Sequence, residues 1–116
     1  MKIFLYQIFN AKKALDRLFN SEMSPRLAYR VADLIEAVNP ELEKIEKVRV
    51  KLVKENLEEG ERQVVKNLET FSKAFDEFLD EEIELEYEPE ISIDDLPDTV
   101  EVSPKEMHLI RPFLAE

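Results

Sequence analysis

The chain has 116 residues, of which 44% are hydrophobic and 37% are charged, a composition that suits one folded domain and excludes a disordered chain. It contains no cysteine, which excludes disulfides, thiol nucleophiles and thiolate metal sites. The net charge of −11 is uneven, because residues 1–66 carry a net +2 and residues 67–116 carry a net −13, so we do not expect the second half to bind nucleic acid.

The N-terminal segment allows two interpretations. Apolar side chains recur at alternating intervals of four and three residues, which predicts a helix over about residues 3–20: Phe4, Ile8, Ala11, Leu15 and Leu18. Residues 3–9 are also rich in β-branched and aromatic types. The alternative is therefore a short strand to Phe9, with Asn10 capping a helix that follows.

A long helix is predicted from Pro25 to about Glu58. Ser24 suits the N-cap position, and Pro25 suits the first helical position. A coiled-coil-like apolar seam follows for three heptads, at Val31, Leu34, Val38, Leu42, Ile45, Val48 and Leu52. Pro40 interrupts this seam, but the heptads keep their phase across it. A kink is thus favoured over a complete break, in which Asn39 and Pro40 would start a new helix.

The next segment predicts the second arm of a helical hairpin. Gly60, the single glycine of the chain, lies where the long helix would end in a left-handed residue. An apolar stripe at helical spacing follows, at Val64, Leu68, Phe71, Phe75 and Phe78. We expect this helix of about 15 to 20 residues to pack antiparallel against the heptad seam, so the hairpin covers about residues 25–80.

The apolar period then changes to two, which predicts strands. Residues 83–93 alternate between apolar and mostly acidic side chains, and Pro89 makes this an edge strand or bends it. Residues 99–102 predict a second short strand, which would complete a β-hairpin over about residues 83–102. Two strands alone are marginal in water. The hairpin must therefore pack on the helices, or gain a third strand from the N-terminus or from another subunit.

A short helix closes the chain. Ser103 and Glu106 form a capping-box pattern, and Pro112 predicts that the helix ends at about Ile110 or Arg111. The expected fold class is therefore α+β and mostly α, a single domain over residues 1–116. Its helical part spans about residues 1–82, and the acidic β-hairpin and C-terminal helix span residues 83–116.

Residues capable of chemistry are few. His108 is the single histidine, and no glycine-rich phosphate loop or nucleophile elbow is present. Asp94, Asp95 and Asp98 form the best local carboxylate cluster, but they lack the alternation and the glycine of a calcium loop. We therefore assign no catalytic, cofactor-binding or metal-binding residue, and we expect no enzyme.

Two charged faces are the candidate interaction residues. The acidic face of the predicted strand consists of Glu84, Glu86, Glu88 and Glu90. The long helix carries a basic face at intervals of three and four residues, made of Lys44, Lys47, Lys51 and Lys54. The acidic face is either a solvated surface that protects a strand edge, or it docks against these lysines of the same or another chain.

The sequence also resembles a family of small proteins from tailed bacteriophages and prophages of Gram-positive bacteria. The resemblance covers nearly the whole chain and rests on four segments: NAKKALDRL (10–18), PRLAYRVADLI (25–35), EKIEKVRVKLV (43–53) and LIRPFL (109–114). It implies a phage or prophage origin and the host cytoplasm. It transfers no active-site residue, because proteins of this kind have no assigned function.

We therefore expect a non-enzymatic interaction or assembly protein that forms a homo-oligomer, without a cofactor. The alternative is an acidic nucleic-acid mimic that inhibits a nucleic-acid-binding protein of the host. No membrane partner is expected, because no run of about 18 consecutive apolar residues is present.

Overall fold

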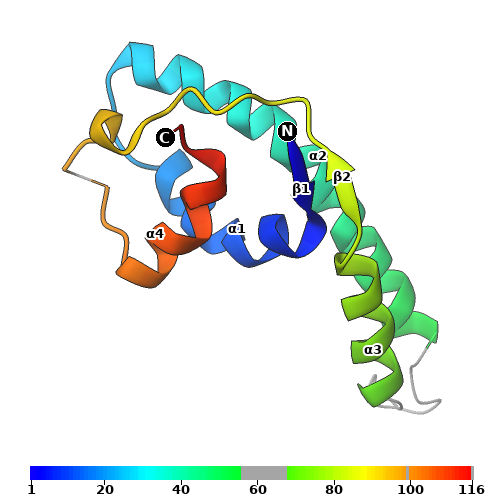
Figure 1. Cartoon of the computed structure of the whole chain (residues 1–116). Helices are drawn as coiled ribbons and strands as arrows, with labels where there is room; N and C mark the ends of the chain where they lie inside the picture. Colours follow the sequence, from blue (N-terminus) through cyan, green and yellow to red (C-terminus); the bar gives the residue numbers. More distant parts are fainter. Residues whose placement is uncertain (56–67, 99, 116) are drawn as a thin grey trace.

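The computed structural model describes residues 1–55, 68–98 and 100–115. Its elements follow the order β1 (Lys2–Phe4), α1 (Leu5–Phe19), α2 (Pro25–Glu55), α3 (Leu68–Leu79), β2 (Glu82–Glu84), the 3-10 turn η1 (Ile93–Asp95), α4 (Pro104–Ile110) and the 3-10 turn η2 (Arg111–Phe113) (Figure 1). The expected class, α+β and mostly α, is confirmed.

The N-terminal segment contains both a strand and a helix. The strand β1 is only three residues long, and α1 starts at Leu5, where the side chain of Gln7 accepts a hydrogen bond from the Phe4 amide at 2.9 Å. The alternative cap at Asn10 is wrong, because Asn10 lies inside α1. The buried residues of α1 form one broad face, and α2, α3 and α4 all pack against this helix.

Helix α2 continues through Pro40, as the favoured interpretation required, so the alternative of a complete break is wrong. Figure 1 shows that its axis bends near its middle, with the other helices and both strands on the inner side of the bend. Ser24 caps the helix as expected, since its hydroxyl accepts a hydrogen bond from the Leu27 amide at 3.3 Å. The expected end near Glu58 and the stop at Gly60 lie outside the described residues.

The heptad seam of α2 packs against two helices, whereas the hairpin prediction expected one. Val31, Leu34, Val38 and Ile45 are buried, and α2 packs against α1 as well as α3. Helix α3 runs back along the C-terminal half of α2, as the hairpin prediction required (Figure 1). Phe75 of α3 is buried, and its ring contacts Phe9 of α1 edge-on at a centroid distance of 5.4 Å. The expected helix start near Val64 lies outside the described residues.

The predicted β-hairpin over residues 83–102 is wrong. β2 pairs antiparallel with β1, in a register that places Ile3 opposite Ile83, and residues 100–102 form no strand. The N-terminus thus supplies the partner strand, which was one of the two sources considered for an additional strand. After β2 the alternating segment stays extended but leaves the sheet, and packs against helices instead of a second strand.

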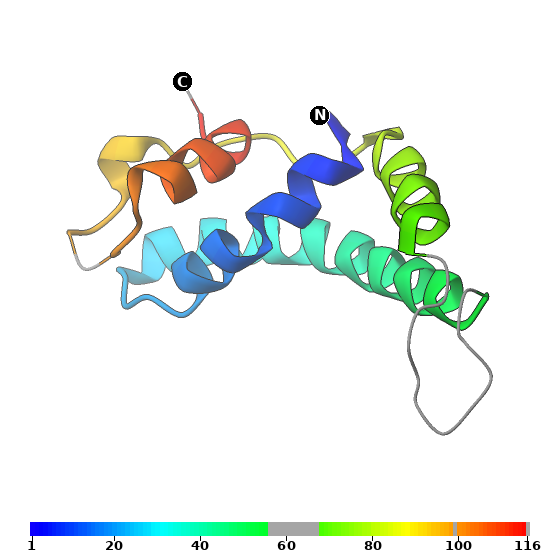
Figure 2. The same ribbon diagram turned by 90° about the horizontal axis from the view of Figure 1, so that it is seen from below.

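The C-terminal residues complete the same core. Ser103 and Glu106 form the predicted capping box, and α4 ends at Ile110, as Pro112 predicts. Arg17 of α1 donates a hydrogen bond to the Glu106 carboxylate at 2.8 Å. Figure 2 shows α1 crossing α2, with α4 toward one end of the molecule and α3 toward the other. Buried residues from all of these helices belong to one hydrophobic cluster.

Candidate interaction surface

The acidic face begins at Glu84, the last residue of β2, and continues along the segment that follows this strand. Leu85, Tyr87 and Ile91 are buried, whereas the glutamates between and beside them are exposed: Glu84, Glu86, Glu88 and Glu90. Alternate residues of an extended chain lie about 7 Å apart. The sequence prediction of an apolar inner face and an acidic outer face is therefore confirmed, although Glu84 is the one member of this set that belongs to a strand of the sheet. We call these four glutamates the acidic row.

Backbone and side-chain hydrogen bonds fix the segment in place. The Met1 α-ammonium donates to the carbonyl oxygens of Leu85, at 2.7 Å, and Tyr87, at 3.3 Å. The Tyr87 hydroxyl donates to the Phe113 carbonyl at 3.0 Å, and burial raises the pKa of this phenol. At the other end, the Ala115 amide donates to the Ile91 carbonyl at 2.8 Å. The acidic row is thus presented by a segment held at both ends and in its middle.

The acidic row borders a groove against the N-terminal half of α2. The groove has a volume of about 600 Å³. Helix α2 lines one side of it with Arg30, Asp33, Glu36, Ala37, Pro40 and Glu41, and residues 84–88 and 90 line the other. Seven of these lining residues are carboxylates, and Arg30 is the one basic residue among the described residues that line it. Two elements distant in sequence thus place acidic side chains on facing sides of one groove.

Arg30 neutralises only part of this charge, and it also faces a carboxylate outside the groove. Its guanidinium lies 3.6 Å from the carboxylate of Asp95 in η1. The amide and hydroxyl of Ser92 hydrogen-bond the Asp95 carboxylate, and with Arg30 nearby they lower the pKa of that carboxyl. The Met1 α-ammonium, 3.4 Å from Glu84, and Lys44, 3.5 Å from Glu41, offset a further part, so the groove keeps a net negative charge.

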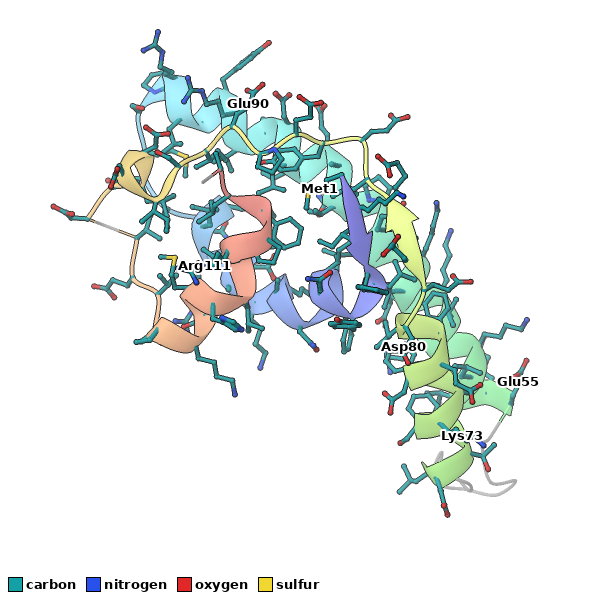
Figure 3. The ribbon with its side chains drawn as sticks, viewed as in Figure 1. Met1, Glu55, Lys73, Asp80, Glu90 and Arg111 are labelled. Atoms are coloured by element: carbon teal, nitrogen blue, oxygen red, sulfur yellow. The ribbon has the colours of Figure 1, made fainter. Side chains whose placement is uncertain are left out.

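The lysines of α2 do not lie against the acidic row of their own chain. Lys44 and Lys51 pair with glutamates of their own helix, Glu41 at 3.5 Å and Glu55 at 4.0 Å. Lys47 and Lys54 form no ion pair with the described residues, and with Val50 they line a shallow hollow of about 370 Å³. In Figure 3, Glu90 and Glu55 mark two well-separated regions of the molecule. The predicted docking of these two faces within one chain is absent from the described residues.

Arg49 and Glu46, which lie beside these lysines on α2, form an ion pair with each other. The Arg49 guanidinium donates to both carboxylate oxygens of Glu46, with an Nε–Oε2 distance of 2.9 Å. This hydrogen bonding lowers the pKa of Glu46 and raises that of Arg49. The four lysines thus differ from Arg49, whose charge is matched by a bidentate partner.

Sequence reasoning missed the part of the groove that α2 contributes. Asp33, Glu36 and Glu41 were not singled out, because nothing local in the sequence places them beside a segment 50 residues away. The sequence did contain a signal that Asp33 and Pro40 share one face of the helix with the lysines, because they belong to the same series of three- and four-residue intervals as Lys44, Lys47 and Lys51. The exposed aromatic residue Tyr29 was also missed, and it is 75% exposed.

The other residues considered for chemistry, His108 and the carboxylates, do not converge on one site among the described residues. His108 lines a broad hollow of about 990 Å³ together with Tyr6, Ile93, Leu109 and Arg111. Within residues 1–55, 68–98 and 100–115, no three His, Asp or Glu side chains converge in a way that could hold a metal ion. None of the helices in these ranges combines the length and the apolar character needed to cross a bilayer.

Comparisons with known proteins add no relative: no protein-family model, no curated protein and no solved structure matches this chain significantly.

Proposed function

We propose that the protein is a non-enzymatic interaction protein that assembles with further copies of itself. The observation that carries this proposal is the separation of charge on its surface, with an acidic groove beside one half of α2 and lysines along the other half. Glu41 of the groove pairs with Lys44 and Glu84 pairs with the Met1 α-ammonium, but most carboxylates of the groove do not meet the lysines of their own chain, so these charges are available to meet between chains. The resemblance described above supports a phage or prophage origin, and with it the host cytoplasm as the setting.

The chemistry of the interior supports a role without catalysis. No charged side chain is buried among the described residues, and the buried Tyr87 hydroxyl is occupied by a backbone carbonyl. The groups whose pKa is shifted, Glu46, Arg49, Tyr87 and Asp95, each have a structural reason for it.

Light scattering and sedimentation across ionic strength test this proposal. We expect a dimer or larger species at low salt that dissociates as salt screens the charges. Neutralising the acidic row with E84Q, E86Q, E88Q and E90Q should abolish assembly and leave the circular dichroism spectrum unchanged. The matched control neutralises three exposed carboxylates of α3 and the one that directly follows it, with E69Q, D76N, E77Q and D80N, and should still assemble. A monomer from micromolar to near-millimolar concentration would contradict the proposal.

The second candidate is an acidic nucleic-acid mimic. It is favoured by the exposure of all four glutamates of the acidic row, which place four negative charges within seven residues of one segment. A mimic would remain monomeric and would compete with duplex DNA or RNA for a basic host protein. Self-association that is lost together with the acidic row would instead favour the assembly function.

A further inference from the structure

We infer that a second copy of this chain docks antiparallel along the outer face of α2, so that the lysines of each copy meet the acidic groove of the other. This inference rests on the proposed function and names the surface that assembly would use. The outer face comprises α2 positions Tyr29, Asp33, Glu36, Pro40, Lys44, Lys47, Lys51 and Lys54, which recur at intervals of three and four residues.

This face of α2 is the side turned away from the core. The buried residues of the helix, such as Val31, Val38 and Ile45, lie on the opposite side of the helical wheel from Tyr29, Pro40 and Lys47. Figure 1 shows no other helix on the outer side of the bend, where only the extended segment that carries the acidic row crosses α2. Most residues of the outer face are exposed, so a second copy could reach it without any change in the fold.

The charges on this face change sign along the helix. Asp33 and Glu36 stand in its N-terminal half, where the acidic row adds four carboxylates across the groove. Its C-terminal half carries the four lysines. Parallel pairing would place acid against acid and base against base. Antiparallel pairing places each acidic half against a basic half, and it does so twice because a two-fold axis relates the copies.

The exposed apolar side chains of α2 fit the same arrangement. Tyr29 is 75% exposed and Val50 is 37% exposed, and they are the two large apolar residues of α2 that are exposed. They are separated by 21 residues, or about 31 Å along the helix. An axis near Pro40 lies midway between them, so Tyr29 of each copy would reach the hollow that Val50, Lys47, Lys51 and Lys54 line on the other.

The bend of α2 is compatible with this contact. The outer face is convex, so two copies touch first near Pro40, and the gap widens toward both ends. The residues placed toward the ends have long side chains, namely tyrosine and lysines, which can bridge a wider gap than the proline and Ala37 near the middle. We therefore place the two-fold axis near Pro40.

Cysteine cross-linking tests the geometry directly, because the natural chain has no cysteine. P40C should form a disulfide with itself under mild oxidation, since a disulfide requires Cα atoms within about 7 Å. D33C alone should not, because its two copies would lie about 20 Å apart along the paired helices. A mixture of D33C and K47C should cross-link. Efficient self-cross-linking of D33C would indicate a parallel pair and overturn the inference.

Charge reversal tests the chemistry. We expect dimerisation to weaken about tenfold or more in the double variant D33K and E36K, and equally in the double variant K47E and K51E. Each variant creates like-charge contacts at two places, because the two-fold axis repeats the contact. All four substitutions in one chain should restore it to within about threefold of wild type, because acid again faces base. The matched control K12E and K13E, on exposed positions of α1, should leave the dimer intact.

The outcomes separate the two proposals. A wild-type monomer overturns both the proposed function and this inference. A dimer that survives both charge-reversal pairs and does not cross-link through P40C keeps the proposed function and overturns the antiparallel α2 interface. Loss of the dimer in both pairs, with rescue in the fourfold variant, supports it.

Discussion

Tyr87 shows how one side chain can hold an irregular segment in place. It lies in the extended stretch that carries the acidic row, where no second strand pairs with the backbone. Its ring is buried, and its hydroxyl donates to the carbonyl of Phe113, 26 residues later. The segment is thus fixed to the C-terminal turn by a specific contact, which a pattern of alternating residues cannot reveal.

We predict that Tyr87→Phe lowers the free energy of unfolding by about 1–2 kcal/mol, because the Phe113 carbonyl loses its donor in a buried place. Urea denaturation followed by circular dichroism measures this change. Tyr29→Phe is the matched control and should have no effect on unfolding, since Tyr29 is 75% exposed. A Tyr87→Phe variant as stable as wild type would show that the hydrogen bond does not hold the segment.

The raised pKa of Tyr87 predicts that the stability of the fold falls at alkaline pH. Burial raises the pKa of Tyr87, so the folded state keeps the phenolic proton at a pH where the unfolded chain has lost it. Stability from this group is complete below a pH of about 10 and is lost as the pH rises through the folded-state pKa. Tyr87→Phe should remove this part of the alkaline destabilisation, as urea midpoints at pH 8 and above 10 can show.

At the scale of the elements, local signals were reliable and long-range pairing was not. Ser24 and Ser103 cap the helices that they were expected to cap, because a cap depends on residues three positions away. The partner of β2 lies some 80 residues earlier in the chain, at β1. The sequence gives no register for such a contact, so it predicted a hairpin with the nearest β-like run, residues 99–102.

The seam of α2 provides a prediction at this scale. Ile45 is 2% exposed, between the region of α2 that packs on α1 and the region that packs on α3. We expect Ile45→Asp to destabilise the fold by more than about 3 kcal/mol, because it buries an unpaired charge. Ala32→Asp, on an exposed position of the same helix, is the control and should cost well under about 1 kcal/mol. Similar thermal melts for the two variants would mean that the seam is not core.

Pro40 provides a second prediction at the scale of the elements. Proline inside a helix removes one backbone hydrogen bond and clashes with the preceding turn, and α2 nevertheless continues through this position. We expect Pro40→Ala to stabilise the monomer by about 1–2 kcal/mol, which is less than the full helical penalty because proline also restricts the unfolded chain. Chemical denaturation at high salt, where assembly is screened, measures this. A destabilised variant would show that the bend is required by the packing against α1 and α3.

At the scale of the whole molecule, the candidate surface exists only because distant segments meet. The acidic row was visible in the sequence, but the groove needs Asp33, Glu36 and Glu41 of α2 beside it. Likewise, the two ends of the chain close one core, since α4 packs on α1 and Arg17 binds the capping Glu106. Such features depend on the tertiary arrangement of helices, which patterns within each helix do not encode.

This arrangement leads to a prediction about cooperativity. Phe113, near the C-terminus, is fully buried, and Phe75 of α3 is 8% exposed near the other end of the molecule, yet both belong to one hydrophobic cluster. If residues 1–116 form a single domain, Phe113→Ala and Phe75→Ala should each lower the midpoint of the same unfolding transition. For the better-buried Phe113, the free energy of unfolding should fall by about 3–5 kcal/mol. Circular dichroism reports the helices, and tyrosine fluorescence in a Tyr6→Phe, Tyr29→Phe background, where Tyr87 is the one tyrosine left, reports the C-terminal side of the core. Coincident curves from both probes, in wild type and in both variants, are the expected result. A Phe113→Ala protein in which the Tyr87 signal is lost before the helical signal would instead show that residues 85–115 unfold separately, and that the pairing of α2 with α3 stands without them.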